Sequence, residues 1–283
     1  MALGPSDYKK MQKRFYSRAA DSEQSARRVV HPDYEMARRQ AGSSLMYMLN
    51  DYALRTQSAL VGADLTSMLA AAVALPEGLR LLDFGCGVGR LMEALVASGF
   101  SVDGTDVSEE MLAFARANPK LSKCSFYLSG GGDCGDSPRG HYDIVYSQLC
   151  IQHIASRQIR KEIFSSVHDA LKPGGMFSFQ LHFYPGLDSK EVPLPHVSWD
   201  SDKFDALGTN SEEDVWFTAD ALPSLMADLS GLFQDVRIQI VDFPANAELH
   251  TEAYGVRFSH AIISGSKGFS LAQRVYAEMR EDS

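Results

Sequence analysis

The sequence predicts an α/β fold with a doubly wound, mostly parallel sheet of seven strands, an antiparallel hairpin at the sheet edge and a helical N-terminal arm. Between residues 79 and 183, short apolar runs alternate with amphipathic segments, as parallel strands alternate with crossover helices. Only about ten residues separate the last two apolar runs, which is too few for a crossover helix, so these two strands are expected to be antiparallel.

The first 76 residues are expected to form a helical arm or lid. Ser6 and Asp33 predict the N-caps of helices over 6–20 and 33–58, and Pro32 separates the two helices. A third helix, over 64–74, ends near Pro76. Because the pattern changes to short apolar runs from there, residues 1–76 are assigned to the arm.

Residues 77–268 are expected to form the core domain. Five strands over 79–84, 101–105, 124–128, 142–147 and 176–183 alternate with helices over 91–97, 108–117 and 156–171. A helix capped by Thr218 runs to residue 232 and precedes the strand pair over 236–243 and 254–264. The insertion over 184–217 is too long for a simple connection and predicts a lid or binding loop. A C-terminal helix is expected over 269–283.

The composition is that of an ordinary globular protein, with 45% hydrophobic and 22% charged residues. No apolar run approaches the roughly 20 residues of a membrane-spanning helix, and no signal peptide is evident, so a cytoplasmic protein without membrane contact is expected. The four cysteines lack metal-ligand spacing, so no metal is expected. A net charge of −9 argues against a nucleic-acid partner. The oligomeric state is not indicated.

A glycine-rich turn follows the first predicted strand, with the sequence Asp83-Phe-Gly-Cys-Gly-Val-Gly89. Glycines at such a position let a ligand approach the main chain closely. A dinucleotide-binding turn has a third small residue where this chain has Arg90. Asp83 is unfavourable beside a pyrophosphate but suits a cationic ammonium group. The turn therefore disfavours a dehydrogenase.

These residues resemble the first motif of the class I S-adenosylmethionine (SAM)-dependent methyltransferases, an acid and one further residue before G-x-G-x-G. The resemblance continues in Val102-Asp-Gly-Thr-Asp106, in residues 131–133, in the strand and loop over 141–153 and in the turn over 171–177. It implies an enzyme with the Rossmann-like methyltransferase fold and SAM as its cofactor.

The resemblance also implies which residues bind the cofactor. The glycine turn would hold the methionine end of SAM, and Asp106, which lies 21 residues beyond Gly85, would hold the ribose. Asp133 would meet the adenine, and Tyr16 of the arm would fold over the cofactor or pack as a helix-face aromatic. The implied cofactor-binding residues are Tyr16, Asp83, Gly85, Cys86, Gly87, Asp106, Val107, Gly132, Asp133, Ser147 and Gln148.

Two histidines are candidate catalytic residues. His153 follows the fourth predicted strand and His182 ends the fifth, at the edge where ligands bind in open α/β sheets. An imidazole near its neutral pKa can take a proton from a hydroxyl nucleophile. A packing or loop role stays open for both.

The insertion contains both tryptophans of the chain, with eight Asp or Glu and two Lys. Such residues can enclose a cationic substrate, but a solvated acidic loop over packed aromatics is the favoured interpretation. The predicted function is transfer of a methyl group from SAM to an O or N atom of a small-molecule acceptor. Two alternatives stay open: a methyltransferase acting on RNA or protein, and a SAM- or nucleotide-binding module that catalyses no transfer.

Overall fold

A computed structural model gives the fold and describes residues 4–20, 22, 26, 45–55, 78–192, 197–202, 215–241 and 259–268. Several predicted segments lie outside these residues. They are the helices over 64–74 and 269–283, residues 33–44 and 56–58 of the second arm helix, residues 242–243 at the end of the strand over 236–243, and residues 254–258 at the start of the last strand.

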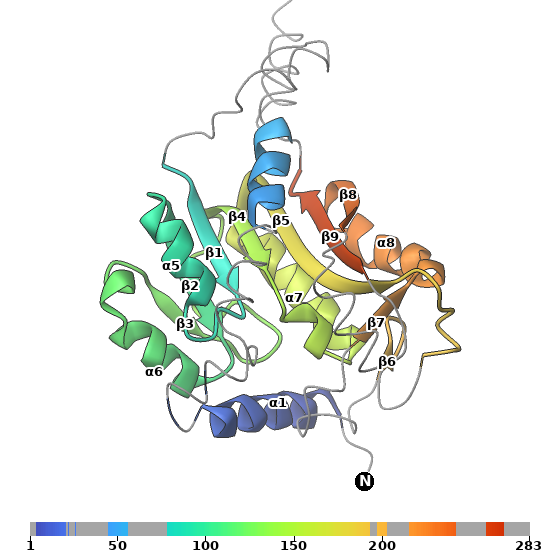
Figure 1. Cartoon of the computed structure of the whole chain (residues 1–283), viewed down its shortest axis with the longest axis horizontal. Coiled ribbons are helices and arrows are strands. Elements are labelled where there is room, and N and C mark those ends of the chain that lie inside the picture. The colour runs from blue at the N-terminus through green and yellow to red at the C-terminus, as the bar shows by residue number, and fades with distance from the viewer. Residues whose placement is uncertain are drawn as a thin grey trace, which may run out of the picture.

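The described strands form one sheet whose centre is parallel (Figure 1). The order is β3-β2-β1-β4-β5, and β9 and β8 follow as an antiparallel pair. This order confirms the doubly wound sheet and the antiparallel edge pair. The bounds are β1 Arg80–Phe84, β2 Ser101–Asp106, β3 Phe126–Leu128, β4 Tyr142–Ser147, β5 Leu171–Tyr184, β8 Gln234–Val241 and β9 Ser259–Ser266.

Two short strands beyond the seven predicted come from the insertion and its end. β7 (Val215–Thr218) pairs with the last residues of β5, and β6 (Val197–Ser198) pairs with β7. Thr218 ends β7 and is also the N-cap of the predicted helical segment, with the extended backbone usual at that position, although its side chain makes no capping hydrogen bond. Helix α8 (Leu222–Ser230) begins only after a further 3-10 turn.

Helices cover both faces of the sheet. α7 (Arg157–Ala170) and α8 pack on one face, where Phe164 contacts Phe177. The helix formed by residues 45–55 and α5 (Arg90–Ala97) pack on the other face. Strands that are buried on both faces explain the near-continuous apolar runs in the sequence.

Helix starts follow local capping rules. Ser108 accepts the Met111 N–H at 3.2 Å and begins α6 (Glu109–Ala117), and Ser156 caps α7 in the same way. The predicted helices over 108–117 and 156–171 thus start at the expected residues. α1 (Pro5–Ala19) starts earlier than predicted: Gly4 is the N-cap instead of Ser6, because a proline is favoured at the first helical position.

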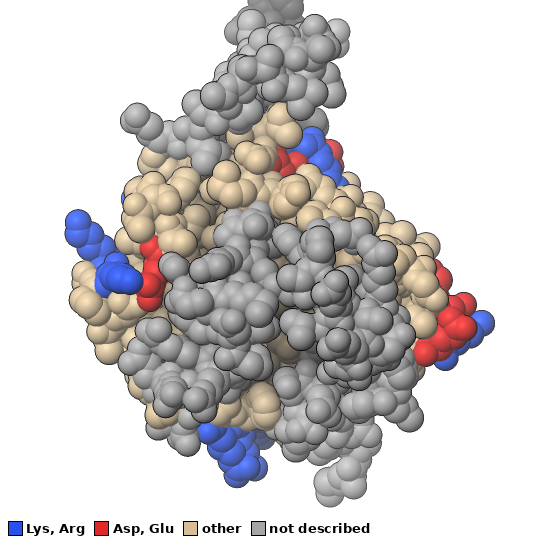
Figure 2. All heavy atoms as spheres, viewed as in Figure 1, with Lys and Arg blue, Asp and Glu red and all other residues tan. Residues whose placement is uncertain are grey.

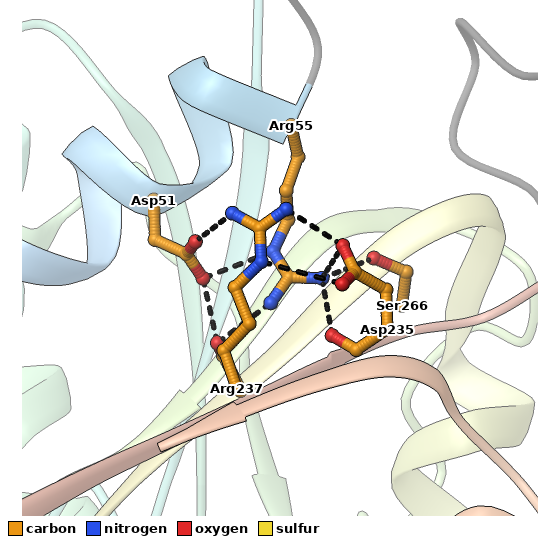
Figure 3. Close-up of polar contacts among 6 residues, drawn as sticks. Asp51, Arg55, Asp235, Arg237 and Ser266 are labelled. Atoms are coloured by element: carbon orange, nitrogen blue, oxygen red, sulfur yellow. Dashed lines mark hydrogen bonds and ion pairs between the residues drawn. The ribbon is translucent and has the colours of Figure 1, made fainter. Parts of the chain in front are cut away.

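A buried ion-pair network holds the 45–55 helix on the sheet (Figure 3). Arg55 is 4% exposed and donates to Asp51 on its own helix and to Asp235 and Ser266. Arg237 of β8 also donates to Asp51 and Asp235. Asp235 has a φ of 49° where the register between β8 and β9 shifts, and its carboxylate contacts both arginines.

Candidate functional site

The glycine turn leaves β1 at the carboxyl edge of the sheet and leads into α5. The N–H groups of Gly85 and Cys86 donate to the Thr105 carbonyl at 2.8 and 3.0 Å. Gly85, Gly87 and Gly89 have φ angles of 78°, 53° and 83°, which residues with a side chain rarely adopt. β1 lies between β2 and β4, where the strand order reverses, and ligands bind at this point in open α/β sheets.

The three turn glycines differ in what surrounds them. A Cβ at Gly85 would overlap the Cys150 thiol, and a Cβ at Gly89 would overlap the Leu121 side chain. A Cβ at Gly87 would meet no described atom within 4 Å. The main chain at Gly87 therefore faces open space among the described residues, while the main chain at Gly85 and at Gly89 is packed against side chains.

Asp83 lies buried beside the turn and is 2% exposed. Burial raises the pKa of its carboxyl group to about 7; the Tyr146 hydroxyl and the Arg90 guanidinium oppose the rise, and Asp106 adds to it. A carboxyl group poised in this way gains its charge readily when a cation binds beside it. Asp83 therefore fits the ammonium group of SAM.

Asp106 ends β2 and braces the glycine turn. Its Oδ2 accepts the Gly87 N–H at 2.8 Å and its Oδ1 accepts the Ser108 N–H at 2.9 Å. Burial raises the pKa of this carboxyl group, and the N–H groups of Ser108, Gly87 and Val107 lower it. Because a carboxylate has about four lone-pair positions, Asp106 can hold the turn and still accept hydrogen bonds from ribose hydroxyl groups.

The loop after β3 holds Gly132 and Asp133 in a closed turn. Asp133 Oδ1 accepts the N–H groups of Gly130 and of a second loop glycine, at 2.9 and 2.8 Å. Gly132 is buried against Lys9 and Glu162, whose ion pair joins α1 to α7. One Asp133 oxygen is therefore committed to the loop, and an adenine contact has to use Oδ2 or the main chain.

The loop after β4 packs against the glycine turn. Ser147 is fully buried and donates its hydroxyl to the Phe84 carbonyl at 2.9 Å. Gln148 is 9% exposed, and its Oε1 has no hydrogen-bond partner in the described part of the chain. The next residue, Leu149, has a strained φ of 52°. Gln148 rather than Ser147 therefore has a side-chain acceptor that no described residue uses.

The two candidate catalytic histidines lie in different settings at this edge. His153 ends a 3-10 turn (Ile151–His153), and its carbonyl accepts the Gln12 side chain of α1 at 2.9 Å. His182 lies on β5 directly opposite His260 of β9, with the ring centroids 5.2 Å apart. The two predicted histidines are thus on separate elements, and the ring that contacts His182 is a third histidine.

Helix α1 runs along the carboxyl edge of the sheet, next to the loops that follow the parallel strands (Figure 1). The Tyr8 hydroxyl accepts the Ala155 N–H at 2.9 Å, and Gln12 holds the turn at His153. Tyr16, on the same helix, is partly buried and packs edge-on against Phe15. α1 thus lies beside the loops that carry the predicted cofactor-binding residues.

Sequence reasoning missed Tyr8 and Gln12, which dock α1, and Cys150, which packs on the glycine turn. No local pattern distinguishes them. His260 was missed although it lies in a predicted strand. Burial raises the pKa of Cys150 to about 12, so its thiol stays neutral and packs.

The described residues contain no group of three or more His, Cys, Asp or Glu that could hold a metal ion. Within the same residues, no helix is long and apolar enough to cross a membrane.

The fold and the site together define a doubly wound α/β domain with one buried and one partly buried aspartate at a glycine turn. Residues 81–175 match a protein family described as a methyltransferase domain. This part of the chain thus matches a methyltransferase domain, and SAM is the cofactor that the resemblance of the glycine turn implies.

Known proteins similar to this chain carry the same domain. A putative methyltransferase YqeM of Bacillus subtilis is 34% identical over 111 residues, 38% of this chain and 44% of that protein. A trans-aconitate 2-methyltransferase of Variovorax paradoxus is 34% identical over 128 residues, 44% of this chain and 45% of that protein. The chain thus spans less than half the length of these curated relatives.

Among solved structures, a geranyl diphosphate C-methyltransferase from Streptomyces coelicolor has a similar fold. Its TM-score is 0.53 at 16% identity, and the match covers 94% of this chain and 100% of that one. At this identity the likeness concerns the fold alone.

Proposed function

We propose that this chain transfers a methyl group from SAM to an O or N atom of a small-molecule acceptor. The observation that carries the proposal is the glycine turn, open at Gly87 and flanked by the buried Asp83 and the partly buried Asp106. The cytoplasmic location expected from the sequence is part of the same proposal.

Each of the site residues would bind a different part of the cofactor. Asp83 would hold the ammonium group, the main chain at Gly85, Cys86 and Gly87 the methionine end, and Asp106 with Val107 the ribose. SAM supplies an electrophilic methyl group on a sulfonium centre. The protein itself would act mainly by positioning the reactants, which can supply a large share of a rate enhancement. The loop residues Gly132, Asp133, Ser147 and Gln148 would line the adenine and donor ends, and Tyr16 would cover the cofactor.

A small molecule is the favoured acceptor class. Similar proteins include a ubiquinone biosynthesis O-methyltransferase of Hydrogenovibrio crunogenus and a phosphoethanolamine N-methyltransferase of Arabidopsis thaliana. The net charge of −9 disfavours RNA. On the face shown in Figure 2, the described Lys and Arg side chains lie in small separate groups.

An acceptor screen with methyl-radiolabelled SAM tests the proposal. The panel contains phenols, alcohols, carboxylic acids and amines, with bulk tRNA and a protein extract as separate arms. We expect label in one small-molecule class. Label in tRNA or protein alone would overturn the small-molecule part, and a protein that fails to bind S-adenosylhomocysteine would overturn the cofactor site.

Cofactor affinity is expected to rise about tenfold between pH 6 and pH 8. An ammonium group favours the ionised form of Asp83, whose pKa is about 7 in the free protein, so binding at pH 7 releases close to half a proton. Calorimetry with S-adenosylhomocysteine, in buffers of different ionisation enthalpy, measures both quantities. Without ligand, pH changes the stability of the protein in the opposite direction. Because the pKa of Asp83 is raised in the folded protein, ionisation of Asp83 lowers the free energy of unfolding as pH rises from about 4 to 7.

Asp83→Asn should remove this pH dependence and weaken binding at pH 8. Asp136→Asn, at an exposed aspartate on the loop after β3, is the matched control and should change neither. Equal affinities of the wild-type protein at pH 6 and pH 8 would show that Asp83 does not face the cation.

A further inference from the structure

The segment over residues 153–156, between the 3-10 turn after β4 and helix α7, contacts two separate parts of the chain. On one side, the Tyr8 hydroxyl of α1 accepts the Ala155 N–H at 2.9 Å. On the other side, the Ser156 hydroxyl donates to Asp202 of the insertion at 3.1 Å. The arm helix and the insertion therefore bind to the same short stretch of main chain.

Residues 199–202 of the insertion are bound along the first turn of α7. The Asp202 carboxylate accepts the Gln158 N–H at 2.7 Å, and the Ser201 carbonyl accepts the Arg157 N–H at 3.1 Å. N–H groups in the first turn of a helix have no acceptor within the helix itself. The insertion thus supplies acceptors that α7 lacks, and these bonds fix its position relative to α7.

Trp199 is the buried anchor of this part of the insertion. The side chain is fully buried, and its ring stacks at 6.3 Å on Phe164 of α7. Its indole N–H donates to Asp228 of α8 at 3.1 Å, and Arg157 pairs with the same carboxylate at 2.9 Å. The insertion is therefore attached to the domain both at Trp199 and at Asp202.

Arg160 of α7 connects the two sides. Its guanidinium donates to the Ile154 carbonyl in the shared segment and to the Trp199 carbonyl in the insertion, and it lies 4.3 Å over the Trp199 ring. The side chain is fully buried, and burial lowers its pKa to about 10, so it stays charged at neutral pH. An apolar side chain would cost less to bury, but a planar fork of donors can bond two carbonyls from separate segments at once.

We propose that Arg160 is a positioning residue that couples the insertion to the arm helix α1. With the insertion bound on α7, Arg160 holds the Ile154 carbonyl and thereby presents the Ala155 N–H to Tyr8. This proposal rests on the proposed function, in which Tyr16 of α1 covers SAM. Attachment of the insertion therefore strengthens cofactor binding, and by linkage cofactor binding strengthens attachment of the insertion.

Hydrogen exchange of the full chain without any ligand tests the coupling itself. Asp202→Ala removes an exposed carboxylate whose contacts are with α7, and it leaves the buried side chains in place, so the variant should fold. We expect the amides of α1 to exchange about threefold to tenfold faster in this variant. Asp188→Asn is the matched control, at an exposed aspartate of the same insertion that accepts the Lys190 N–H, and should leave α1 unchanged. Unchanged exchange of α1 in Asp202→Ala would overturn the proposal.

A double-mutant cycle assigns the coupling to Arg160. Tyr8→Phe removes the hydroxyl that accepts the Ala155 N–H, and calorimetry measures S-adenosylhomocysteine affinity for Tyr8→Phe, Asp202→Ala and the double variant. We expect each single variant to bind roughly fivefold more weakly, and the double variant to lose much less than the product of the two losses. In an Arg160→Lys background the two losses should multiply, because one ammonium group lacks the fork that bonds both carbonyls. Losses that multiply in the wild-type background would contradict the coupling.

The reciprocal effect is read in the wild-type protein alone, so it decides the matter even if Arg160→Lys does not fold. S-adenosylhomocysteine should slow exchange of the amides over residues 197–202 about threefold to tenfold. Unchanged exchange there, in protein that has bound the ligand, would also overturn the proposal. Because the first exchange measurement needs no ligand, a protein that fails to bind S-adenosylhomocysteine would overturn the cofactor site, and the response of α1 to Asp202→Ala would still decide whether arm and insertion are coupled.

Discussion

Asp106→Ala is expected to weaken S-adenosylhomocysteine binding roughly 100-fold or more. The carboxylate would lose two charge-assisted hydrogen bonds to the ribose, each worth about 1.5–3 kcal/mol. It would also lose the bonds from the Gly87 and Ser108 N–H groups, which hold the glycine turn in its ligand-accepting shape. Calorimetry at pH 8 measures the dissociation constant directly.

A second variant separates binding from folding. Asp106→Asn keeps one acceptor oxygen for the turn but loses the charge and the second acceptor, so it should fold and still bind weakly. Glu109→Gln is the matched control, because Glu109 is an exposed acid nearby on α6 that pairs with Arg116. Wild-type affinity in a folded Asp106→Asn protein would remove Asp106 from the cofactor site.

The fold could be predicted where local signals and the global topology agree. The helices predicted over 108–117 and 156–171 start at Ser108 and Ser156, and the strand over residues 142–147 has the predicted bounds. The structure differs from the prediction where strands that are far apart in the sequence pair with each other. β7 was not predicted, because it forms by pairing with the end of β5. No local propensity of residues 215–218 contains that information.

In the candidate site, too, the features set by local sequence could be predicted and those set by distant pairing could not. The glycine turn and Asp106 could be identified because a ligand that approaches the main chain imposes a spacing on the sequence. The contact between His182 and His260 could not, because it depends on the register of two strands that are far apart in the chain. The docking of α1 through Tyr8 likewise depends on where the loop after β4 lies.

Asp51→Ala is expected to lower the free energy of unfolding by about 3–5 kcal/mol and the melting temperature by roughly 10 °C. The variant leaves Arg55, whose side chain is 3% exposed, and Arg237 with one carboxylate, that of Asp235, between them. A buried charge that loses its partner costs far more than the intact pair contributes. Thermal and urea unfolding measure the change.

Two comparisons make this result specific to the network. Arg139→Ala removes an ion pair with Asp169 whose arginine side chain is 84% exposed, and it should change stability by less than about 0.5 kcal/mol. The double variant Asp51→Leu with Arg55→Leu should recover much of the loss, because apolar residues can replace a buried pair.

Ser266 lies opposite Met176, near the start of β5 and away from the carboxyl edge. The network therefore anchors the 45–55 helix at the opposite edge of the sheet from the glycine turn. Folded Asp51→Ala protein should for this reason bind S-adenosylhomocysteine with wild-type affinity. A tenfold loss of that affinity would show that the two edges are coupled.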